Sequence, residues 1–187
     1  STGLIFPIDD IVKIAKKQNI LTIVDGAHVP GHIPININAI GADIYTGTCH
    51  KWLLCPKGVS FLYVNRNIQD QIDPLVISWG YNNSETKRTT FQDHHLWQGT
   101  RDISAFLTVP SALDFRESFS WEAVSNRCKN MILDVRKEIK SIVNGKPLID
   151  SNPEEWLGQM FSFAIPNPII DNQNIINTMI KKYKVEI

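Results

Sequence analysis

Two side chains in the first third of the chain could take part in covalent and acid–base chemistry, Lys51 and Asp25. Lys51 lies in the stretch GTCHKWLL, residues 47–54, where it follows His50 and precedes three apolar side chains. Lysine is almost never fully buried without a partner or a chemical task, so this position needs an explanation. Asp25 ends the apolar run ILTIV and is followed by Gly26, as expected where a buried strand enters a turn.

The elements around these two residues predict where their side chains lie. An amphipathic helix is expected over residues 7–19, followed by a buried strand that ends at Asp25. A second strand is expected over roughly 43–46 and a third over 58–64. Ligands of open α/β sheets bind outside the carboxyl ends of the strands. Asp25 and Lys51 are therefore expected to reach one pocket.

A carboxylate and a nucleophilic lysine in one crevice suit the chemistry of pyridoxal phosphate. Lys51 can form a Schiff base with the aldehyde of this cofactor, and Asp25 can keep the pyridine nitrogen protonated so that the ring withdraws electrons. Asp25 could instead only cap the turn that follows it. The histidines of DGAH and CHK could also form a metal hydrolase site. Cys49 and Cys55 form no C-x-x-C pair beside them, so no metal site is predicted.

Four motifs follow one another in this part of the chain: DGAH, TGTCHKW, PKG and GTRD. Together they resemble the class V aminotransferase family of fold type I pyridoxal-phosphate enzymes, and within it the isopenicillin N epimerase-like branch. The resemblance covers residues 1 to about 115 and extends over the rest by layout only. It implies the fold of the C-terminal part of that family's large domain.

The resemblance implies roles for several side chains near the lysine. Lys51 matches the lysine that forms the Schiff base, and Asp25 matches the partner of the pyridine nitrogen. His28 matches the position that contacts the phenolic oxygen of the cofactor. Thr48 and His50 match the side chains that bind phosphate just before the lysine. The two histidines could instead be core or supporting residues, and Thr48 could simply end its strand.

The GTRD motif concerns the oligomeric state of the protein. Gly99 and Thr100 match a loop that reaches the phosphate of the neighbouring subunit, so the resemblance implies a homodimer with shared active sites. A helical pattern begins at Asp102, and Thr100 is therefore expected near a helix start, where backbone N–H groups favour a phosphate. Thr100 could instead only cap its own helix.

The segment before this motif, residues 65–100, is rich in polar side chains and predicts a long irregular excursion. Long loops in compact domains are usually functional or disordered. His94 and His95 within it are expected to be solvated, with contact to a substrate as the alternative.

The rest of the chain predicts helices and then a small α/β unit. Residues 103–115 form one helical segment that Pro110 should kink or break, and residues 120–143 form a longer one with Ser120 as N-cap. A boundary is placed near residues 144–146. Two strands and the helix between them are then expected at 160–166, 185–187 and 171–183.

The predicted fold is α/β, with a mixed, mainly parallel sheet covered by helices and followed by the start of a small α/β domain. Residues 1–144 are assigned to the large cofactor-binding domain with its connecting helices, and residues 145–187 to the small domain. The chain opens as if at the end of a strand, so we expect an internal piece of a longer protein. By resemblance, the phosphate loop, the ring-stacking residue and the carboxylate-binding arginine lie outside it.

The composition argues against several classes of partner. The 19 basic residues are balanced by 19 acidic ones, so no net charge attracts nucleic acid. Hydrophobic residues make up 43%, as in packed globular proteins, and no apolar run is long enough to span a membrane. Cys49, Cys55 and Cys128 are irregularly spaced and predict no disulfide framework. A reducing cytoplasm is the simplest compartment.

The sequence thus predicts a pyridoxal-phosphate enzyme that acts at the α-carbon of an amino acid or a derived substrate. Lys51, once displaced by the substrate amine, would serve as the general base. Reprotonation on the opposite face would give epimerisation, and proton delivery to the cofactor would give transamination. Loss of a β-substituent would give a carbon–sulfur lyase or a cysteine desulfurase. A catalytically dead relative used for dimerisation or binding is the non-enzyme alternative, which Lys51 and Asp25 argue against.

Overall fold

The computed structural model describes residues 2–82, 88–143, 146–149, 151–164 and 172–186. The chain divides into two compact units, residues 7–125 and residues 1–6 with 126–187. Among the described residues, no helix is both long and apolar enough to cross a membrane.

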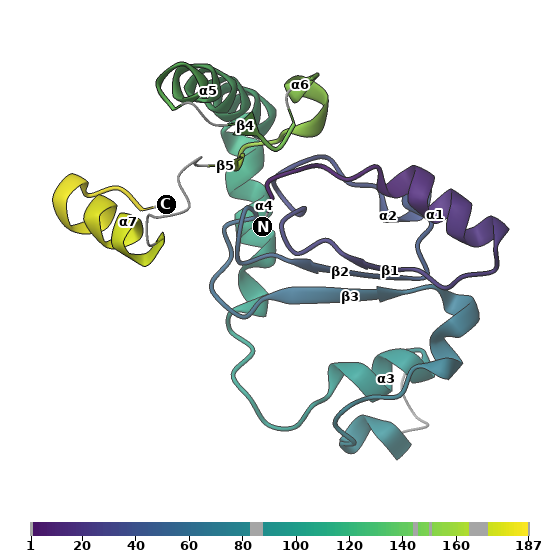
Figure 1. Ribbon diagram of the computed structural model, residues 1–187. Helices are drawn as coiled ribbons and strands as arrows, with labels where there is room; N and C mark the ends of the chain where they lie inside the picture. The colour runs from purple at the N-terminus through teal and green to yellow at the C-terminus, as the bar shows by residue number, and fades with distance from the viewer. Residues whose placement is uncertain (1, 83–87, 144–145, 150, 165–171, 187) are drawn as a thin grey trace. The chain divides into compact units, whose positions relative to one another are not determined.

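A three-stranded mixed sheet is the centre of the first unit (Figure 1). β1 (Ile23–Asp25) pairs in parallel with β2 (Ile44–Thr48), which pairs antiparallel with β3 (Ser60–Val64). The α/β fold with a mixed sheet is therefore confirmed. Of the two pairings among the described strands of this sheet, one is parallel and one is antiparallel.

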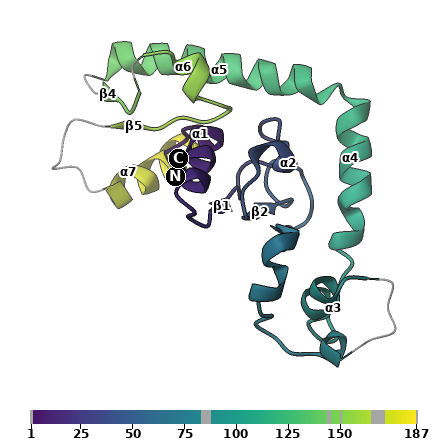
Figure 2. The same ribbon diagram turned by 90° about the vertical axis from the view of Figure 1, so that its right-hand side faces the viewer.

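Helices lie on both sides of this sheet. α1 (Ile8–Lys17) and α2 (Ile37–Ile40) lie on one side, and α3 (Thr90–Leu96) lies on the other, in both of two perpendicular views (Figures 1 and 2). α1 matches the predicted helix, with acidic residues in its first turn and lysines in its last, an order that suits the helix dipole. It buries Val12.

β1 differs from the buried strand that its apolar sequence predicts. Ile23 is 73% exposed, and Ile20 and Leu21 just before it are exposed as well. β1 is an edge strand that pairs only with β2 among the described residues, so one side of it has no neighbour. An apolar run shows that a strand can be buried, but neighbouring elements decide whether it is.

Hydrogen bonds of the Thr22 and Asp43 side chains join β1 and β2 at their amino ends. The Asp43 carboxylate oxygen Oδ2 accepts from the Thr22 N–H at 2.8 Å and from the Thr22 hydroxyl at 2.9 Å. The Asp43 N–H in turn donates to Thr22 Oγ1 at 3.1 Å. These bonds sit just before both strands and support their parallel pairing.

The excursion after β3 contains more regular structure than predicted. It forms 3₁₀ turns at Arg66–Gln71 and Trp79–Asn82 and then the helix α3. α3 begins with a capping box, in which the Thr89 hydroxyl accepts from the Gln92 N–H and the Gln92 side chain accepts from the Thr89 N–H. The prediction of a wholly irregular segment is therefore wrong.

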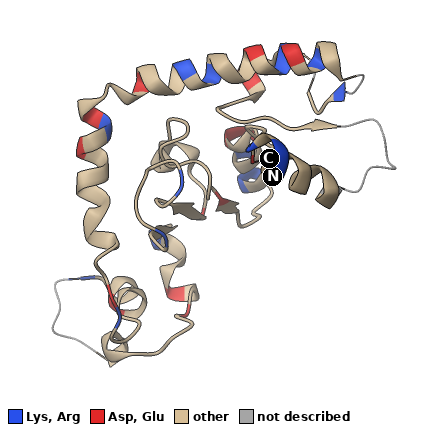
Figure 3. Ribbon diagram, turned by 90° about the vertical axis from the view of Figure 1, so that its left-hand side faces the viewer, with Lys and Arg blue, Asp and Glu red and all other residues tan. Residues whose placement is uncertain are grey.

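Two helices follow the excursion. A 3₁₀ turn at Phe106–Thr108 leads into α4 (Val109–Ser118), which stands across the end of the sheet where β1 and β2 finish (Figure 1). Pro110 lies in the first turn of α4, where its missing N–H costs nothing, so it starts this helix instead of breaking one. α5 (Trp121–Ile142) follows and has charges of both signs interspersed along it (Figure 3).

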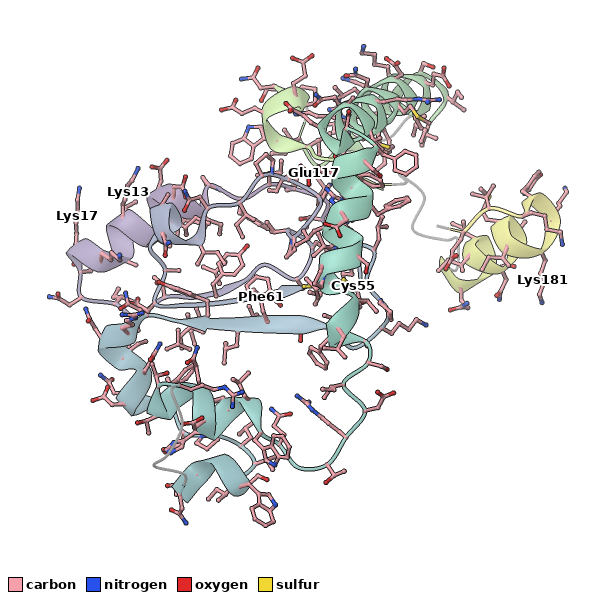
Figure 4. The ribbon with its side chains drawn as sticks, turned by 180° about the vertical axis from the view of Figure 1, so that it is seen from behind. Lys13, Lys17, Cys55, Phe61, Glu117 and Lys181 are labelled. Atoms are coloured by element: carbon pink, nitrogen blue, oxygen red, sulfur yellow. The ribbon has the colours of Figure 1, made fainter. Side chains whose placement is uncertain are left out.

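The hydrophobic cluster of the first unit lies where the sheet meets α4. Buried Cys49, Cys55 and Val59 pack with partly buried side chains of β3, the 3₁₀ turn and α4. Figure 4 labels Cys55 and Phe61 at this junction. The segment that contains Lys51 is thus anchored at both ends in the core.

The second unit contains a two-stranded antiparallel sheet and short helices. β4 (Lys146–Pro147) pairs with β5 (Phe163–Ala164), which lies within the strand predicted at 160–166. The other helical segments are α6 (Pro153–Trp156), α7 (Asn172–Thr178) and a π-helical turn at Met179–Tyr183.

The predicted strand at 185–187 is not formed by its described residues, Val185 and Glu186, which pair with no strand. The boundary predicted near 144–146 falls on residues 144 and 145, which lie outside the described residues. The compact units divide instead at residues 125 and 126, inside α5. The assignment of 1–144 and 145–187 to two domains of the whole protein stays a prediction.

Candidate active site

The parallel pairing of β1 and β2 brings Asp25 and Lys51 to the same edge of the sheet. Asp25 is the last residue of β1 and lies opposite Thr46 of β2. β2 ends at Thr48, and the chain then turns through residues 49–55, which we call the lysine loop. The loop after β1, residues 26–33, we call the aspartate loop. Both loops leave the sheet at its carboxyl edge, as the strand order predicts.

The lysine loop is closed at its base and exposes Lys51. The Cys49 N–H donates to the Val59 carbonyl at 2.9 Å, and the Cys55 N–H donates to the Cys49 carbonyl at 3.0 Å. Both cysteine side chains are buried, but Lys51 between them is exposed. The expectation of a buried lysine is therefore wrong. Of the apolar side chains that follow Lys51, Leu53 packs against the core, whereas Leu54 is exposed.

Asp25 is also exposed, and it caps the turn that follows β1. Its Oδ1 accepts from the Ala27 N–H at 2.9 Å. Tyr45 lies close by: a side chain at Gly26 would meet the Tyr45 hydroxyl, and burial, assisted by the Asp25 charge, raises the pKa of Tyr45. Turn capping therefore occupies one carboxylate oxygen of Asp25, and it does not exclude a second role for the charge.

His28 lies within electrostatic reach of both residues. Burial lowers the pKa of His28, the positive charge of Lys51 lowers it further, and the charge of Asp25 opposes the shift. The Trp52 indole Nε1–H donates to His28 Nδ1 at 3.3 Å. Asp25, His28 and Lys51 are thus three polar groups gathered at one edge.

Thr48 and His50, the predicted phosphate-binding residues, make hydrogen bonds to backbone carbonyls. The Thr48 hydroxyl donates to the Ala27 carbonyl at 2.5 Å. His50 Nδ1 lies 2.9 Å from the Val59 carbonyl and so must be the donor. Nε2 of His50 could then donate to a phosphate only when the ring is protonated and positively charged.

Arg116 of α4 joins the two loops and was missed in the sequence. Its Nη1 donates to the Trp52 carbonyl and its Nη2 to the Gly31 carbonyl, each at 2.9 Å. Its guanidinium group also lies 4.5 Å from the centre of the Trp121 ring. Burial lowers the pKa of Arg116. The two carbonyls are 64 and 85 positions away in sequence, and no local motif points to them.

The loops also touch directly at Gly31. Its φ is +83°, and an added Cβ would lie only 2.6 Å from the Trp52 carbonyl oxygen. His32 stacks on the Trp52 ring with 4.2 Å between ring centres. A residue with a side chain cannot replace Gly31 without separating the aspartate loop from the lysine loop.

Gly99 and Thr100 do not lie at a helix start as predicted. The next helical turn along the chain begins only at Phe106, and Asp102 caps the turn before it by accepting from the Ser104 N–H at 2.8 Å. Thr100 is exposed. Neither the predicted phosphate site at a helix N-terminus nor the alternative helix cap is therefore formed.

His94 and His95 belong to α3 and are not simply solvated. His94 stacks on Tyr81, and its Nε2 lies 3.1 Å from the Tyr81 carbonyl oxygen. His95 packs on Phe91, and its Nδ1 lies 2.8 Å from the Phe91 carbonyl. Nε2 of His95 is buried with no partner among the described residues.

The cysteines and histidines do not gather into a metal site in the described part of the chain, where no three His, Cys, Asp or Glu residues are suitably grouped. Cys49 and Cys55 are buried thiols, and Cys128 is partly buried. Burial raises the pKa of Cys49, and the nearby Cys55 raises it further. Neither change favours a reactive thiolate.

Comparison with known proteins agrees with this arrangement. A family model described as aminotransferase class-V matches residues 1–187. The isopenicillin N epimerase of Amycolatopsis lactamdurans is 30% identical over the whole chain, which covers 49% of that protein. A putative L-cysteine desulfhydrase 1 of Oryza sativa subsp. japonica is 30% identical over 99% of the chain and 39% of its own length.

Among solved structures, the apo form of a cysteine desulfurase from Thermococcus onnurineus NA1 has a TM-score of 0.79. The alignment covers 98% of this chain and 46% of the desulfurase chain. At 19% identity, the match supports the fold alone. The chain spans about half or less of the length of these relatives.

Proposed function

The chain belongs to the aminotransferase class-V family, and we propose that the whole protein is a pyridoxal-phosphate-dependent enzyme acting at the α-carbon of an amino acid or a derived substrate. One observation carries this proposal. The parallel pairing of β1 and β2 brings an exposed carboxylate, Asp25, and an exposed amine, Lys51, to one edge of the sheet.

The side chains at this edge fit the cofactor of the family. Enzymes of this family depend on pyridoxal phosphate. The Lys51 amine suits its aldehyde, and the Asp25 carboxylate suits its ring nitrogen. Among the described residues no ion pair joins Asp25 to Lys51, so neither neutralises the other. When bound, the cofactor supplies an electron-withdrawing ring that stabilises negative charge at the substrate α-carbon.

Each residue at the edge has a definable task. Lys51 would hold the cofactor and, when its amine is free, would remove or return the proton at the substrate α-carbon. Asp25 keeps a proton on the ring nitrogen through its negative charge. His28 would contact the phenolic oxygen of the cofactor. A protonated His50 would bind its phosphate, together with the Thr48 hydroxyl once that hydroxyl turns from the Ala27 carbonyl.

Epimerisation or transamination is the first candidate for the reaction that follows proton removal. The name of the 30% identical epimerase supports the former. A carbon–sulfur lyase is the second candidate, because another relative of equal identity is named a cysteine desulfhydrase. A cysteine desulfurase needs a mobile, reactive cysteine, and the buried Cys49 and Cys55 do not suit that task.

The assembly proposed for the enzyme is a homodimer. Thr100, exposed and preceded by Gly99, would reach the phosphate bound by the partner subunit, and each active site would then contain residues of both chains. The free cysteines suit a reducing compartment, so we place the enzyme in the cytoplasm.

The experiment that tests the cofactor assignment is an absorbance spectrum of the purified full-length protein with pyridoxal phosphate added. A yellow protein is expected, whose visible band disappears on borohydride reduction and whose Lys51 peptide then carries the reduced cofactor. Lys57, also exposed and close in sequence, is the internal control and should stay unmodified. A protein that stays colourless, or that is labelled equally on both lysines, contradicts the proposal.

The reaction type is then read from the products. Amino-acid substrates are incubated with the yellow enzyme in deuterated water. Deuterium at the α-carbon with inversion indicates an epimerase, a keto acid formed only with an acceptor indicates an aminotransferase, and released sulfide indicates a lyase. An absence of all three with every amino acid tried, from an enzyme that has bound cofactor, contradicts action at the α-carbon.

A further inference from the structure

The aspartate and lysine loops are linked by a connected set of contacts that the proposed mechanism does not use. Arg116 donates one hydrogen bond to each loop, to the carbonyls of Gly31 and Trp52. A guanidinium group is suited to this because its donors are fixed in one plane and do not lose their charge. Its position on α4, over the Trp121 ring, fixes both loops to the same helix.

Trp52 is the residue at which these contacts converge. Its carbonyl accepts from Arg116, its ring stacks on His32, and its indole N–H donates to His28. His32 is itself held by the loop, with Nδ1 at 3.2 Å from the His28 carbonyl. Two contacts therefore orient the indole, and a third holds its backbone.

The bond from Trp52 to His28 has a fixed direction. An indole nitrogen can donate but cannot accept, so His28 Nδ1 must be the acceptor and cannot hold a proton. A neutral imidazole with a bare Nδ1 has its proton on Nε2. The Trp52 bond therefore selects one of the two neutral tautomers of His28 and disfavours the doubly protonated ring.

We propose that Trp52 and Arg116 are positioning residues that hold His28 as the neutral tautomer with its proton on Nε2. Arg116 places the backbone of Trp52, and the Trp52 indole fixes the His28 proton. Resting on the proposed function, this makes the contact of His28 with the phenolic oxygen of the cofactor a donated hydrogen bond. A donor at that oxygen stabilises its ionised form.

The charged groups around His28 are consistent with this state. Lys51 on the lysine loop opposes a positive charge on His28, whereas Asp25 at the end of β1 favours one. His32, on the same loop, interacts with His28 as a like charge when both are protonated. The net direction for the pKa of His28 is downward, with burial as the largest cause.

The tautomer can be measured without cofactor or turnover. Full-length protein labelled with ¹⁵N at histidine is studied by NMR, and a His28→Gln variant identifies the His28 signals. Wild-type Nδ1 should resonate as an unprotonated nitrogen and Nε2 as a protonated one. A wild-type His28 with the proton on Nδ1 would overturn the proposal.

Trp52→Phe isolates the donor, because phenylalanine keeps a ring against His32 but has no N–H. The Nδ1 and Nε2 signals of His28 should move toward each other as the tautomers mix, and the midpoint of its pH titration should rise. Trp97→Phe, at an exposed indole after α3, is the matched control and should change neither. Unchanged His28 signals in Trp52→Phe would refute the role of the indole.

Arg116→Gln tests the second step and should shift the His28 signals in the same direction by less. Arg127→Gln, which removes an exposed arginine, is the control for loss of charge. If Arg116→Gln does not fold, Arg116→Lys replaces it. Lysine keeps the charge and can reach one carbonyl, and a partial shift is then expected. Wild-type His28 signals in the folded Arg116 variant would overturn its role.

A final measurement separates this inference from the proposed function. With cofactor bound, the visible absorbance band is titrated against pH, and its midpoint should rise in Trp52→Phe because the donor at the phenolic oxygen is less well held. A protein that never binds cofactor contradicts the proposed function only, since the NMR result stands by itself. An unchanged midpoint alongside changed NMR signals overturns the contact between His28 and the cofactor.

Discussion

The Asp25–Lys51 edge and the Gly99–Thr100 segment were both singled out by sequence motifs, yet the chain supports them very differently. At the first, Arg116 hydrogen-bonds to both loops and Gly31 packs against the Trp52 carbonyl. At the second, a Cβ added to Gly99 would meet no atom within 4 Å.

The two glycines make this difference clear. Gly31 and Gly99 have similar backbone conformations, with φ of +83° and +99°. The conformation at Gly31 is needed for contact with another loop of the same unit, whereas at Gly99 nothing in the described chain requires it. Chemical groups that the chain itself positions are preformed, and a segment without such support suits a task completed by another molecule.

The largest effect is expected from Lys51→Ala, which removes the central group of the supported edge. Turnover by the full-length protein should fall by about 10²–10⁴-fold or more, because both the cofactor link and the general base are lost. The melting temperature should change little, since Lys51 is exposed. Lys57→Ala is the matched control and should be near wild type; equal losses in the two variants would count against the assignment.

Mixing mutant subunits tests most directly whether Thr100 acts in the active site of the partner subunit. Lys51→Ala and Thr100→Ala proteins, each nearly inactive, are combined under conditions that form heterodimers. If Thr100 serves the partner's site, one site per heterodimer has both defects and the other has none, so activity returns. If Thr100 serves its own subunit, every site keeps one defect and the mixture stays inactive. Recovery is measured as turnover, with heterodimer content checked by two affinity tags.

Asp25→Asn should lower turnover by orders of magnitude while leaving the fold in place. Asparagine keeps an oxygen that can accept from the Ala27 N–H, so the turn is still capped, but the negative charge at the ring nitrogen is lost. Asp114→Asn, at an exposed position of α4, is the control. A variant that melts earlier but turns over normally would show that Asp25 only caps the turn.

The free energy of unfolding should distinguish the two glycines. Gly31→Ala should cost about 2–5 kcal/mol, because the positive φ costs about 1–2 kcal/mol and the clash with Trp52 adds about 1–3. Gly99→Ala should cost only the first part, about 1–2 kcal/mol. Gly58→Ala, with φ of +97° and no atom within 4 Å of the added Cβ, should match Gly99→Ala in chemical denaturation. Equal losses of unfolding free energy in Gly31→Ala and Gly99→Ala would show that the contact of Gly31 with Trp52 does not contribute to stability.

The smallest effect is a pH dependence of stability that originates at the supported edge. The pKa values of His28 and His32 are lowered below 6.5 in the folded chain, mainly by burial. The unfolded chain therefore binds protons first as the pH falls, so this stability is complete well above pH 6.5 and is lost as the pH falls through that value. Melting temperatures should drop between about pH 7.5 and 5.5, and less so when His28→Gln and His32→Phe are combined.

The edge itself was predictable because its signals are local. Apolar runs followed by Asp25–Gly26 and by the lysine loop define two strand ends, and the helix between them makes the strands parallel. Exposure was not predictable in the same way. Ile23 and Lys51 were expected to be buried from their neighbours in sequence, but burial depends on what lies beside them in space.

The helix α3 and the role of Arg116 were both not predicted from the sequence, for different reasons. α3 has a local signal, since Thr89 and Gln92 in TTFQ have the spacing of a capping box. Arg116 had none, because its partners lie 64 and 85 positions away and are backbone carbonyls, which every residue possesses. Positioning residues of this kind are visible only once the chain is folded.

The hydrogen bonds between Thr22 and Asp43 have a consequence at the opposite end of the strands. They fix the alignment of β1 against β2 at Ile23 opposite Ile44, and with it Asp25 opposite Thr46. Side chains alternate between the two faces of a strand, so a slip of one residue would turn the Asp25 carboxylate to the other face of the sheet. A threonine and an aspartate at the amino ends of the two strands therefore determine on which face of the sheet the negative charge stands.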